Sequence, residues 1–184
     1  MANLLKLVCL GGSVQEAVYF MKAQAEFFGG VEIHKGKVGG VEVLRFEAIF
    51  VSERERQPFS LFSLAEVPDF RGVYQLLLAN AHGAIALIPA DVSRIPDARE
   101  VVIPLYQMME ERRKEDEELP VIVQYHWDGQ GSAPSAEGLD RALGVNPQLV
   151  ERVFTRADSD SSAQVVGTLA LLKKAVDEGE SASL

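Results

Sequence analysis

The hydrophobic positions of this chain form short apolar runs that are separated by longer stretches with helical spacing. Residues 83–89 and 120–125 are almost purely apolar, which is typical of strands buried on both faces of a parallel sheet. Residues 4–10 and 149–155 predict two further strands. Helical spacing occurs at residues 14–28, 70–81, 97–118, 135–143 and 162–176. Strands that alternate with helices predict an α/β fold, with a parallel sheet covered on both faces.

Extended segments follow the first helix, which Gly29 and Gly30 end. Residues 31–33 and 38–51 predict strands, and the second of these alternates imperfectly between apolar and charged positions. A charged turn at residues 52–57, followed by Pro58, leads into the apolar run 59–64. We expect an antiparallel hairpin here.

The later helices carry their own signals for starts, ends and interruptions. Pro104 must kink the helix at 97–118 or mark its first turn. The charged end of that helix, residues 110–118, predicts a solvated surface, with an electrostatic docking surface as the alternative. Ser135 is a candidate N-cap, and Gly144 lies just past the end of the same helix. We expect one domain at residues 1–178 and a disordered tail at 179–184.

Charge and composition narrow the possible partners and compartments. The 184 residues have a formal net charge of −9, which predicts repulsion of nucleic acids and of anionic membranes. The single cysteine, Cys9, lies in the first strand, where a buried, inert thiol is expected, and no internal disulfide can form. The chain has no signal-like segment and no apolar run near the ~20 residues that span a bilayer. These features favour a cytoplasmic protein.

The opening strand, glycine turn and helix have the order in which a P-loop protein holds phosphates. Gly11, Gly12 and Ser13 would begin the phosphate-binding signature G-x-x-x-x-G-K-[ST]. Its last three positions fall on Glu16, Ala17 and Val18. The chain therefore places an anion near the expected phosphates and provides neither the lysine nor the Mg²⁺-binding hydroxyl.

Three segments carry a resemblance that spans nearly the whole chain. They are Lys6-Leu-Val-Cys-Leu-Gly11, the stretch from Phe59-Ser-Leu-Phe-Ser-Leu64 through Leu76-Leu-Leu78 to Gly83, and Pro120-Val-Ile-Val-Gln-Tyr125. In order and character they resemble the Ras-like small GTPases, in particular the bacterial MglA family. The resemblance implies a P-loop/Ras-like three-layer sandwich. It also implies a mostly parallel six-stranded sheet with one antiparallel edge strand and about five helices.

The residues that would work in that family are replaced at each motif. The resemblance places the switch II glycine and glutamine on Glu66 and Val67, and the guanine-reading asparagine and lysine on His126 and Trp127. The motif's aspartate position falls on Gly129, but Asp128 lies one residue earlier and could still reach a guanine edge. The loop before Val41 has no threonine, and Asp158 to Ser161 lacks the usual small-residue motif.

These losses imply a pseudo-GTPase, with no catalytic residue and no cofactor. The main expectation is a protein-binding adaptor or scaffold in bacterial polarity or motility. Its partner would be a roadblock-type (MglB-like) dimer or a related component. One alternative is an atypical GTPase that binds GTP or GDP and needs a cation from its partner for hydrolysis. Another is a different small ligand that contacts Trp127 and Asp128.

Candidate contact residues lie on the segment that would form the switch face. Phe70, Arg71 and Tyr74 are residue types enriched at binding hot spots, and Pro68 precedes them. Packing of these side chains on the sheet is the alternative, above all for Tyr74. For Trp127, with His126, the alternatives are plugging the old guanine pocket, packing, stacking on another base or anchoring a partner.

Other chemistry finds weaker support in the sequence. His34, His82 and His126 lie far apart without ligand spacing, so ordinary surface or capping histidines are expected instead of a metal site. Ser13 lacks the full G-x-S-x-G elbow of a serine nucleophile. Glu16 and Glu66 would form a carboxylate pair with a raised pKa only if the fold joins their loops, and two unpaired surface carboxylates are favoured.

Overall fold

The computed structural model describes residues 4–11, 13–52, 55–65, 72–115, 117–127, 129, 132–156 and 161–182. These residues form seven strands, five α-helices and one short 3-10 helix, η1. In chain order the elements are β1 (Leu5–Gly11), α1 (Val14–Phe27), β2 (His34–Val38), β3 (Val41–Val51), β4 (Arg56–Leu64), α2 (Gly72–Leu78), β5 (Gly83–Pro89), η1 (Val92–Arg94), α3 (Ile95–Arg113), β6 (Val121–Trp127), α4 (Ala136–Leu143), β7 (Glu151–Arg156) and α5 (Ser161–Ala182).

The strands form a single mixed sheet in the order β2-β3-β4-β1-β5-β6-β7. All neighbouring pairs from β4 to β7 are parallel, while β3 is antiparallel to both β2 and β4. Six strands therefore share one direction and β3 opposes them. The expectation of six strands was wrong because β2 adds a seventh, and the antiparallel strand lies one position inside the edge.

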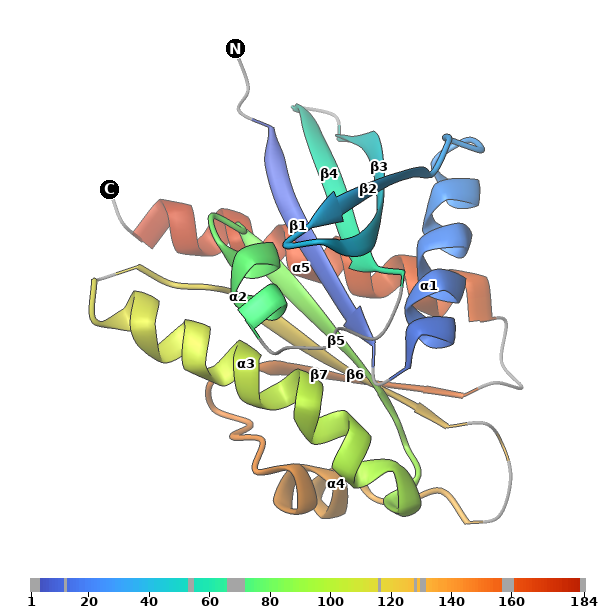
Figure 1. Cartoon of the computed structure of the whole chain (residues 1–184), viewed down its shortest axis with the longest axis vertical. Coiled ribbons are helices and arrows are strands. Elements are labelled where there is room, and N and C mark those ends of the chain that lie inside the picture. The colour runs from blue at the N-terminus through green and yellow to red at the C-terminus, as the bar shows by residue number, and fades with distance from the viewer. Residues whose placement is uncertain are drawn as a thin grey trace.

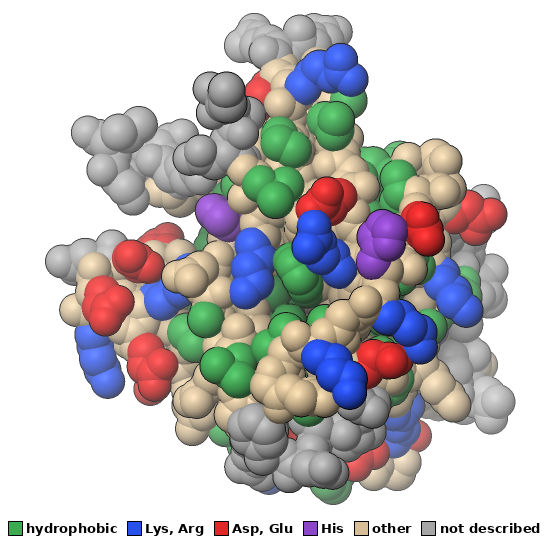
Figure 2. Space-filling view, turned by 45° about the horizontal axis from the view of Figure 1, so that its top comes forward, with side chains coloured by type: hydrophobic (Ala, Val, Ile, Leu, Met, Phe, Trp, Pro, Cys, Tyr) green, Lys and Arg blue, Asp and Glu red, His purple; other side chains and the backbone are tan. Residues whose placement is uncertain are grey.

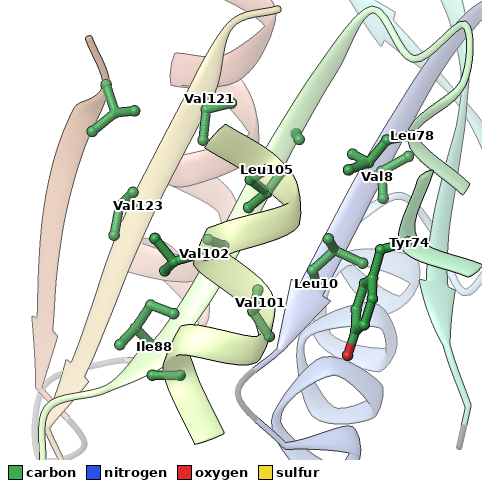
Figure 3. Close-up of a cluster of buried hydrophobic side chains, with 14 of the residues drawn as sticks. Val8, Leu10, Tyr74, Leu78, Ile88, Val101, Val102, Leu105, Val121 and Val123 are labelled. Atoms are coloured by element: carbon green, nitrogen blue, oxygen red, sulfur yellow. The ribbon is translucent and has the colours of Figure 1, made fainter. Parts of the chain in front are cut away.

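Helices cover the two faces of the sheet and make the molecule three-layered (Figure 1). On one face α1 and α5 pack over a cluster that includes Leu7, Phe46 and Phe59. On the other face the cluster joins the sheet to α2, α3 and α4, as the side chains of Val8, Leu10, Leu78 and Leu105 illustrate (Figure 3). Successive residues of β1 alternate between these two cores, as side chains on a strand must.

The hairpins at the β2 edge explain why the sequence pattern was difficult to interpret there. The β3–β4 hairpin is confirmed, with Val51 opposite Arg56 and Phe46 opposite Leu61. The strand expected at residues 31–33 is not formed, and β2 lies just after it. Strand β2 was missed because His34–Val38 is exposed along most of its length and has no apolar alternation. Gly39 and Gly40 connect it to β3 with φ angles of 57° and 86°, which glycine adopts readily.

The helix ends agree with the sequence signals at some positions and differ at others. Ser135 caps α4, its Oγ accepting a hydrogen bond from the Gly138 N–H at 3.1 Å, and Gly144 ends the helix with φ 76°. Pro104 lies inside α3, which ends at Arg113 instead of continuing to residue 118. Helix α5 continues to Ala182, into the tail that was expected to be disordered. No helix among the described residues is both long and apolar enough to cross a bilayer.

Candidate functional site

The candidate site lies where three neighbouring parallel strands end. β1 ends at Gly11, β5 at Pro89 and β6 at Trp127, all at the same edge of the sheet. β1 is also where the strand order reverses, because β4 lies on one side of it and β5 on the other. Open α/β sheets bind ligands at the carboxyl ends of their strands, next to such a reversal. The connection from β1 to α1 is therefore the place to look for ligand chemistry.

That connection is very short. Only positions 12 and 13 lie between the end of β1 at Gly11 and the start of α1 at Val14. Ser13 is the N-cap, and its Oγ accepts a hydrogen bond from the Glu16 N–H at 3.2 Å. In return, the Glu16 carboxylate accepts one from the Ser13 N–H, also at 3.2 Å. This reciprocal capping box places Glu16 in the first turn of the helix and uses backbone donors that a phosphate would need.

Gly11 is required here by close packing, whatever its role in binding. A Cβ at this position would lie 2.5 Å from the Ser13 carbonyl oxygen and 3.0 Å from the Ala17 Cβ. Ala17 is itself buried, so the position expected for a phosphate-binding lysine carries a methyl group inside the helix packing. Val18 packs against the core on the α1 and α5 side. The two positions are therefore structural parts of α1.

Glu16 has a partner that comes from a distant part of the chain. The Arg94 Nη1 donates to the Glu16 Oε1 at 3.1 Å, across 78 positions in sequence. Arg94 is the last residue of η1, which follows β5 directly and is capped by Asp91 through the Ser93 N–H at 2.8 Å. These hydrogen bonds from Ser93 hold the pKa of the Asp91 carboxyl below its usual value. One carboxylate of the chain thus lies at the α1 N-terminus with an arginine opposite it.

Arg94 was not among the residues selected from the sequence, although a signal for it exists. Polar residues that directly follow a buried parallel strand lie at its carboxyl end, where ligand contacts concentrate. Asp91 and Arg94 both follow the apolar run that forms β5. The expected alternative partner of Glu16, a carboxylate at position 66, lies outside the described residues. In the part of the chain that is described, the charge facing Glu16 is positive.

The side chains at the end of β6 pack against the rest of the protein. Trp127 is 8% exposed and belongs to the core between the sheet and α2, α3 and α4, so it does not offer a free ring face for stacking on a base. His126 is partly buried, and its Nδ1 lies 3.1 Å from the Thr155 Oγ1. The Thr155 hydroxyl also donates to the Tyr125 carbonyl oxygen at 3.2 Å. Core packing therefore fixes Trp127, and the contact with Thr155 fixes His126.

Several selected residues lie outside the described part of the chain, and Tyr74 lies in the core. Tyr74 is 8% exposed and packs with Val8 and Leu10 against the sheet (Figure 3), which supports the packing interpretation and not a role as an exposed contact residue. The positions outside the described residues are Gly12, Glu66, Val67, Pro68, Phe70, Arg71, Asp128 and, in the expected last motif, Asp158 to Asp160.

The remaining chemical candidates have structural explanations. His34 is exposed on β2, and the His82 Nδ1 accepts a hydrogen bond from the Lys6 N–H at 3.0 Å. Groups of three or more metal-ligating side chains do not occur among the described residues. Ser13 has an extended backbone (φ −141°, ψ 153°), without the strained turn of a nucleophile elbow. Burial raises the pKa of the Cys9 thiol far above its usual value, as expected for an inert cysteine.

No protein-family model matches the chain, and no curated protein matches it.

Proposed function

We propose that this chain is a Ras-like protein that has lost its nucleotide chemistry and acts as a protein-binding adaptor. The observation that carries the proposal is the first turn of α1, where Glu16 is bonded to the Ser13 N–H and paired with Arg94. A helix N-terminus favours one negative group, and here that group belongs to the chain itself. A nucleotide phosphate at this position would have to displace the carboxylate and separate it from its arginine.

The sheet supports the Ras-like part of the proposal. Six strands share one direction, a single strand opposes them, and β1 lies inside the sheet with its carboxyl end at the candidate site. This arrangement agrees with the mostly parallel sheet that the resemblance implies, apart from the additional edge strand β2. Two helices on one face and three on the other also fit a three-layer sandwich (Figure 1).

The chemistry of phosphoryl transfer supports the loss of activity. Hydrolysis of a nucleoside triphosphate depends on a metal ion, a lysine and backbone dipoles for nearly all of its charge stabilisation. The positions that correspond to the lysine and the metal-binding hydroxyl are the helix residues Ala17 and Val18. Binding another protein needs none of these groups, so it is the role that we infer. In the resembled family these partners include roadblock-type (MglB-like) dimers and polarity or motility proteins, and we infer a partner of this kind.

Titration of the nucleotide-stripped protein with fluorescent GTP and GDP analogues, with and without Mg²⁺, tests the proposal. We expect no saturable binding up to high micromolar concentration. Glu16→Ala is the matched variant, because it removes the carboxylate without lengthening the turn before α1. We expect this variant to remain unable to bind nucleotide, since the short backbone connection is unchanged.

Mg²⁺-dependent binding by the unaltered protein, with turnover alone or after addition of a partner, would contradict the proposal and identify an atypical GTPase instead. Tight binding by Glu16→Ala alone would agree with exclusion of the phosphate by the carboxylate. It would contradict only the expectation that the short connection by itself prevents binding.

A further inference from the structure

One part of the sheet surface is not covered by any of the described helices. Directly opposed residues of neighbouring strands point to the same face. The pairs Arg45 with Phe62 and Ile49 with Pro58 therefore share a face, and Lys6 joins them because it lies opposite Ser60. We call this surface the open face and define it by Lys6, Arg45, Ile49, Val51, Pro58 and Phe62. It lies on the side of the sheet that α2 covers, toward the amino ends of β1 and β4 (Figure 1).

The open face begins where α2 ends. Helix α2 stops at Leu78, and the Lys6 Nζ donates to the Ala79 carbonyl oxygen at 2.6 Å just beyond it. From there β3 and β4 continue toward Val51 and Arg56, while α1 and α5 cover the opposite face of these strands. The described helices therefore cover one face of this hairpin and leave the other face uncovered.

The apolar character of the open face is unusual for a solvated sheet surface. Antiparallel strands with one solvated face carry polar residues on that face. Here Ile49 is 43% exposed and Val51 is 69% exposed, with Pro58 and Phe62 partly buried beside them. Figure 2 shows hydrophobic side chains lying next to basic ones across the middle of this view. The opposed pair of Glu47 and Ser60 lies between Phe62 and the pair of Ile49 with Pro58, so the strip is apolar on both sides of one polar row. Exposed apolar residues bordered by polar ones are typical of binding sites.

Among the described residues, the charges around this apolar strip are mainly positive. The Lys6 Nζ and the Arg45 Cζ lie 5.7 Å and 5.6 Å from the centre of the Phe62 ring, from strands on either side of it. Glu47 is engaged by Arg45 and by the Ser60 hydroxyl, so Lys6, level with Ser60, and Arg56, at the Val51 end of the strip, are the cations in excess among the residues described here. This local excess of positive charge contrasts with the net charge of −9 of the whole chain.

We propose that the open face docks an amphipathic helix of a partner protein, with an apolar stripe flanked by carboxylates. This inference rests on the proposed adaptor function and names the chemistry of its partner. Helices α2, α3 and α4 pack on the same side of the sheet, so a helix is an element whose shape fits this surface. The apolar stripe would cover Ile49, Val51 and Phe62, and the carboxylates would meet Lys6 and Arg56.

The spacing of the two cations fits such a helix. Arg56 and Ser60, the residue opposite Lys6, are separated by four strand positions, or roughly 13 Å. Carboxylates seven positions apart on a helix lie on one side of it and about 10.5 Å apart along its axis. The flexible lysine and arginine side chains can reach over the difference.

The test uses two synthetic helical peptides of 18 residues and the isotope-labelled full chain. The acidic peptide carries a leucine stripe with glutamates seven positions apart on its margin, and the basic peptide has lysines in place of those glutamates. In amide NMR titrations we expect the acidic peptide to shift resonances of β3 and β4 to saturation, and the basic peptide to leave them unchanged. Arg56→Glu is expected to weaken binding of the acidic peptide roughly tenfold, because attraction becomes repulsion.

Two further variants separate the open face from general effects of charge and folding. Val51→Asp changes an exposed side chain and should reduce binding of the acidic peptide at least tenfold by interrupting the apolar strip. Arg141→Glu on α4 makes the same charge change as Arg56→Glu far from the open face, and binding should remain as in the unaltered protein. Circular dichroism checks that each variant is folded.

The proposal is overturned by equal affinity for both peptides, by shifts confined to other elements, or by the absence of saturable shifts. Concentration-dependent dimerisation that Val51→Asp abolishes would also overturn it, because a second copy would then be the occupant. Nucleotide titration of the same sample tests the proposed function separately from the docking of a helix. If the protein binds nucleotide and also selects the acidic peptide, the loss of nucleotide chemistry is refuted and the docking site stands.

Discussion

Replacing Glu16 tests whether its carboxylate stabilises the start of α1. Glu16→Ala removes the acceptor for the Ser13 N–H, worth about 0.5–1.5 kcal/mol for a typical hydrogen bond. It also removes a negative charge at the helix N-terminus, worth about 0.3–1 kcal/mol. The ion pair with Arg94 adds only about 0.2–1 kcal/mol, since both side chains are partly exposed. We expect the free energy of unfolding to fall by about 2 kcal/mol.

Two companion variants divide this loss into its parts. Glu16→Gln keeps an acceptor that suits a capping box but removes the charge, so a loss of about 1 kcal/mol is expected. Arg94→Ala removes only the ion pair and should cost less than about 1 kcal/mol. The double variant Glu16→Gln with Arg94→Ala should cost less than the sum of the two single changes, because each removes the same interaction.

Urea denaturation followed by tryptophan fluorescence provides the measurement. Trp127 is the single tryptophan of the chain and is buried, so its emission reports unfolding. The difference between Glu16→Gln and the unaltered protein should shrink in high salt, which screens the ion pair. Equal stabilities of Glu16→Ala and Glu16→Gln, or strictly additive costs in the double variant, would refute the reasoning. If the difference in stability between Glu16→Gln and the unaltered protein did not depend on salt, the contribution assigned to charge would be contradicted.

Two further predictions concern buried polar groups. The Asp140 carboxylate accepts a hydrogen bond from the Tyr125 hydroxyl at 2.6 Å and pairs with Arg152. Asp140→Ala should lower the unfolding free energy by about 3 kcal/mol, because both partners lose this acceptor. Asn at position 140 should recover part of this loss in the same urea experiment, and equal losses for both would contradict the assignment. Cys9 should react with a thiol reagent only on unfolding, and stability should fall as pH rises above about 9. The sign follows because the unfolded thiol can then ionise while the folded one, with its raised pKa, cannot. Cys9→Ala should reduce this loss of stability at high pH. An unchanged dependence of stability on pH would contradict the assignment to Cys9.

Most of the fold could be predicted from the sequence because its signals are local. The apolar run at residues 83–89 corresponds to β5, and the cap residues Ser135 and Gly144 bound α4 as expected. Strand β2 could not be predicted in the same way, since His34–Val38 is held in the sheet by pairing with β3 and not by an apolar face of its own. An edge strand of this kind depends on its neighbour, which a pattern within the segment does not contain.

The candidate site was less accessible to sequence reasoning because its contacts are distant along the chain. The glycine turn and the unusual carboxylate at Glu16 were visible, but Arg94 is 78 positions away and no periodic pattern connects the two. Tyr74 and Trp127 were considered for surface roles from their residue types alone. Their burial depends on where α2 and β6 pack in the assembled core, which only the tertiary structure decides.

The short connection between β1 and α1 also determines which changes could restore phosphate binding. A P-loop needs free backbone N–H groups from several residues before its helix begins. Here α1 begins at Val14, and a Cβ added at Gly11 would lie 3.0 Å from the Ala17 Cβ. Substituting lysine and threonine at positions 17 and 18 would add side chains to an existing helix and supply no loop. Such a site would require inserted residues, so single substitutions would not restore phosphate binding.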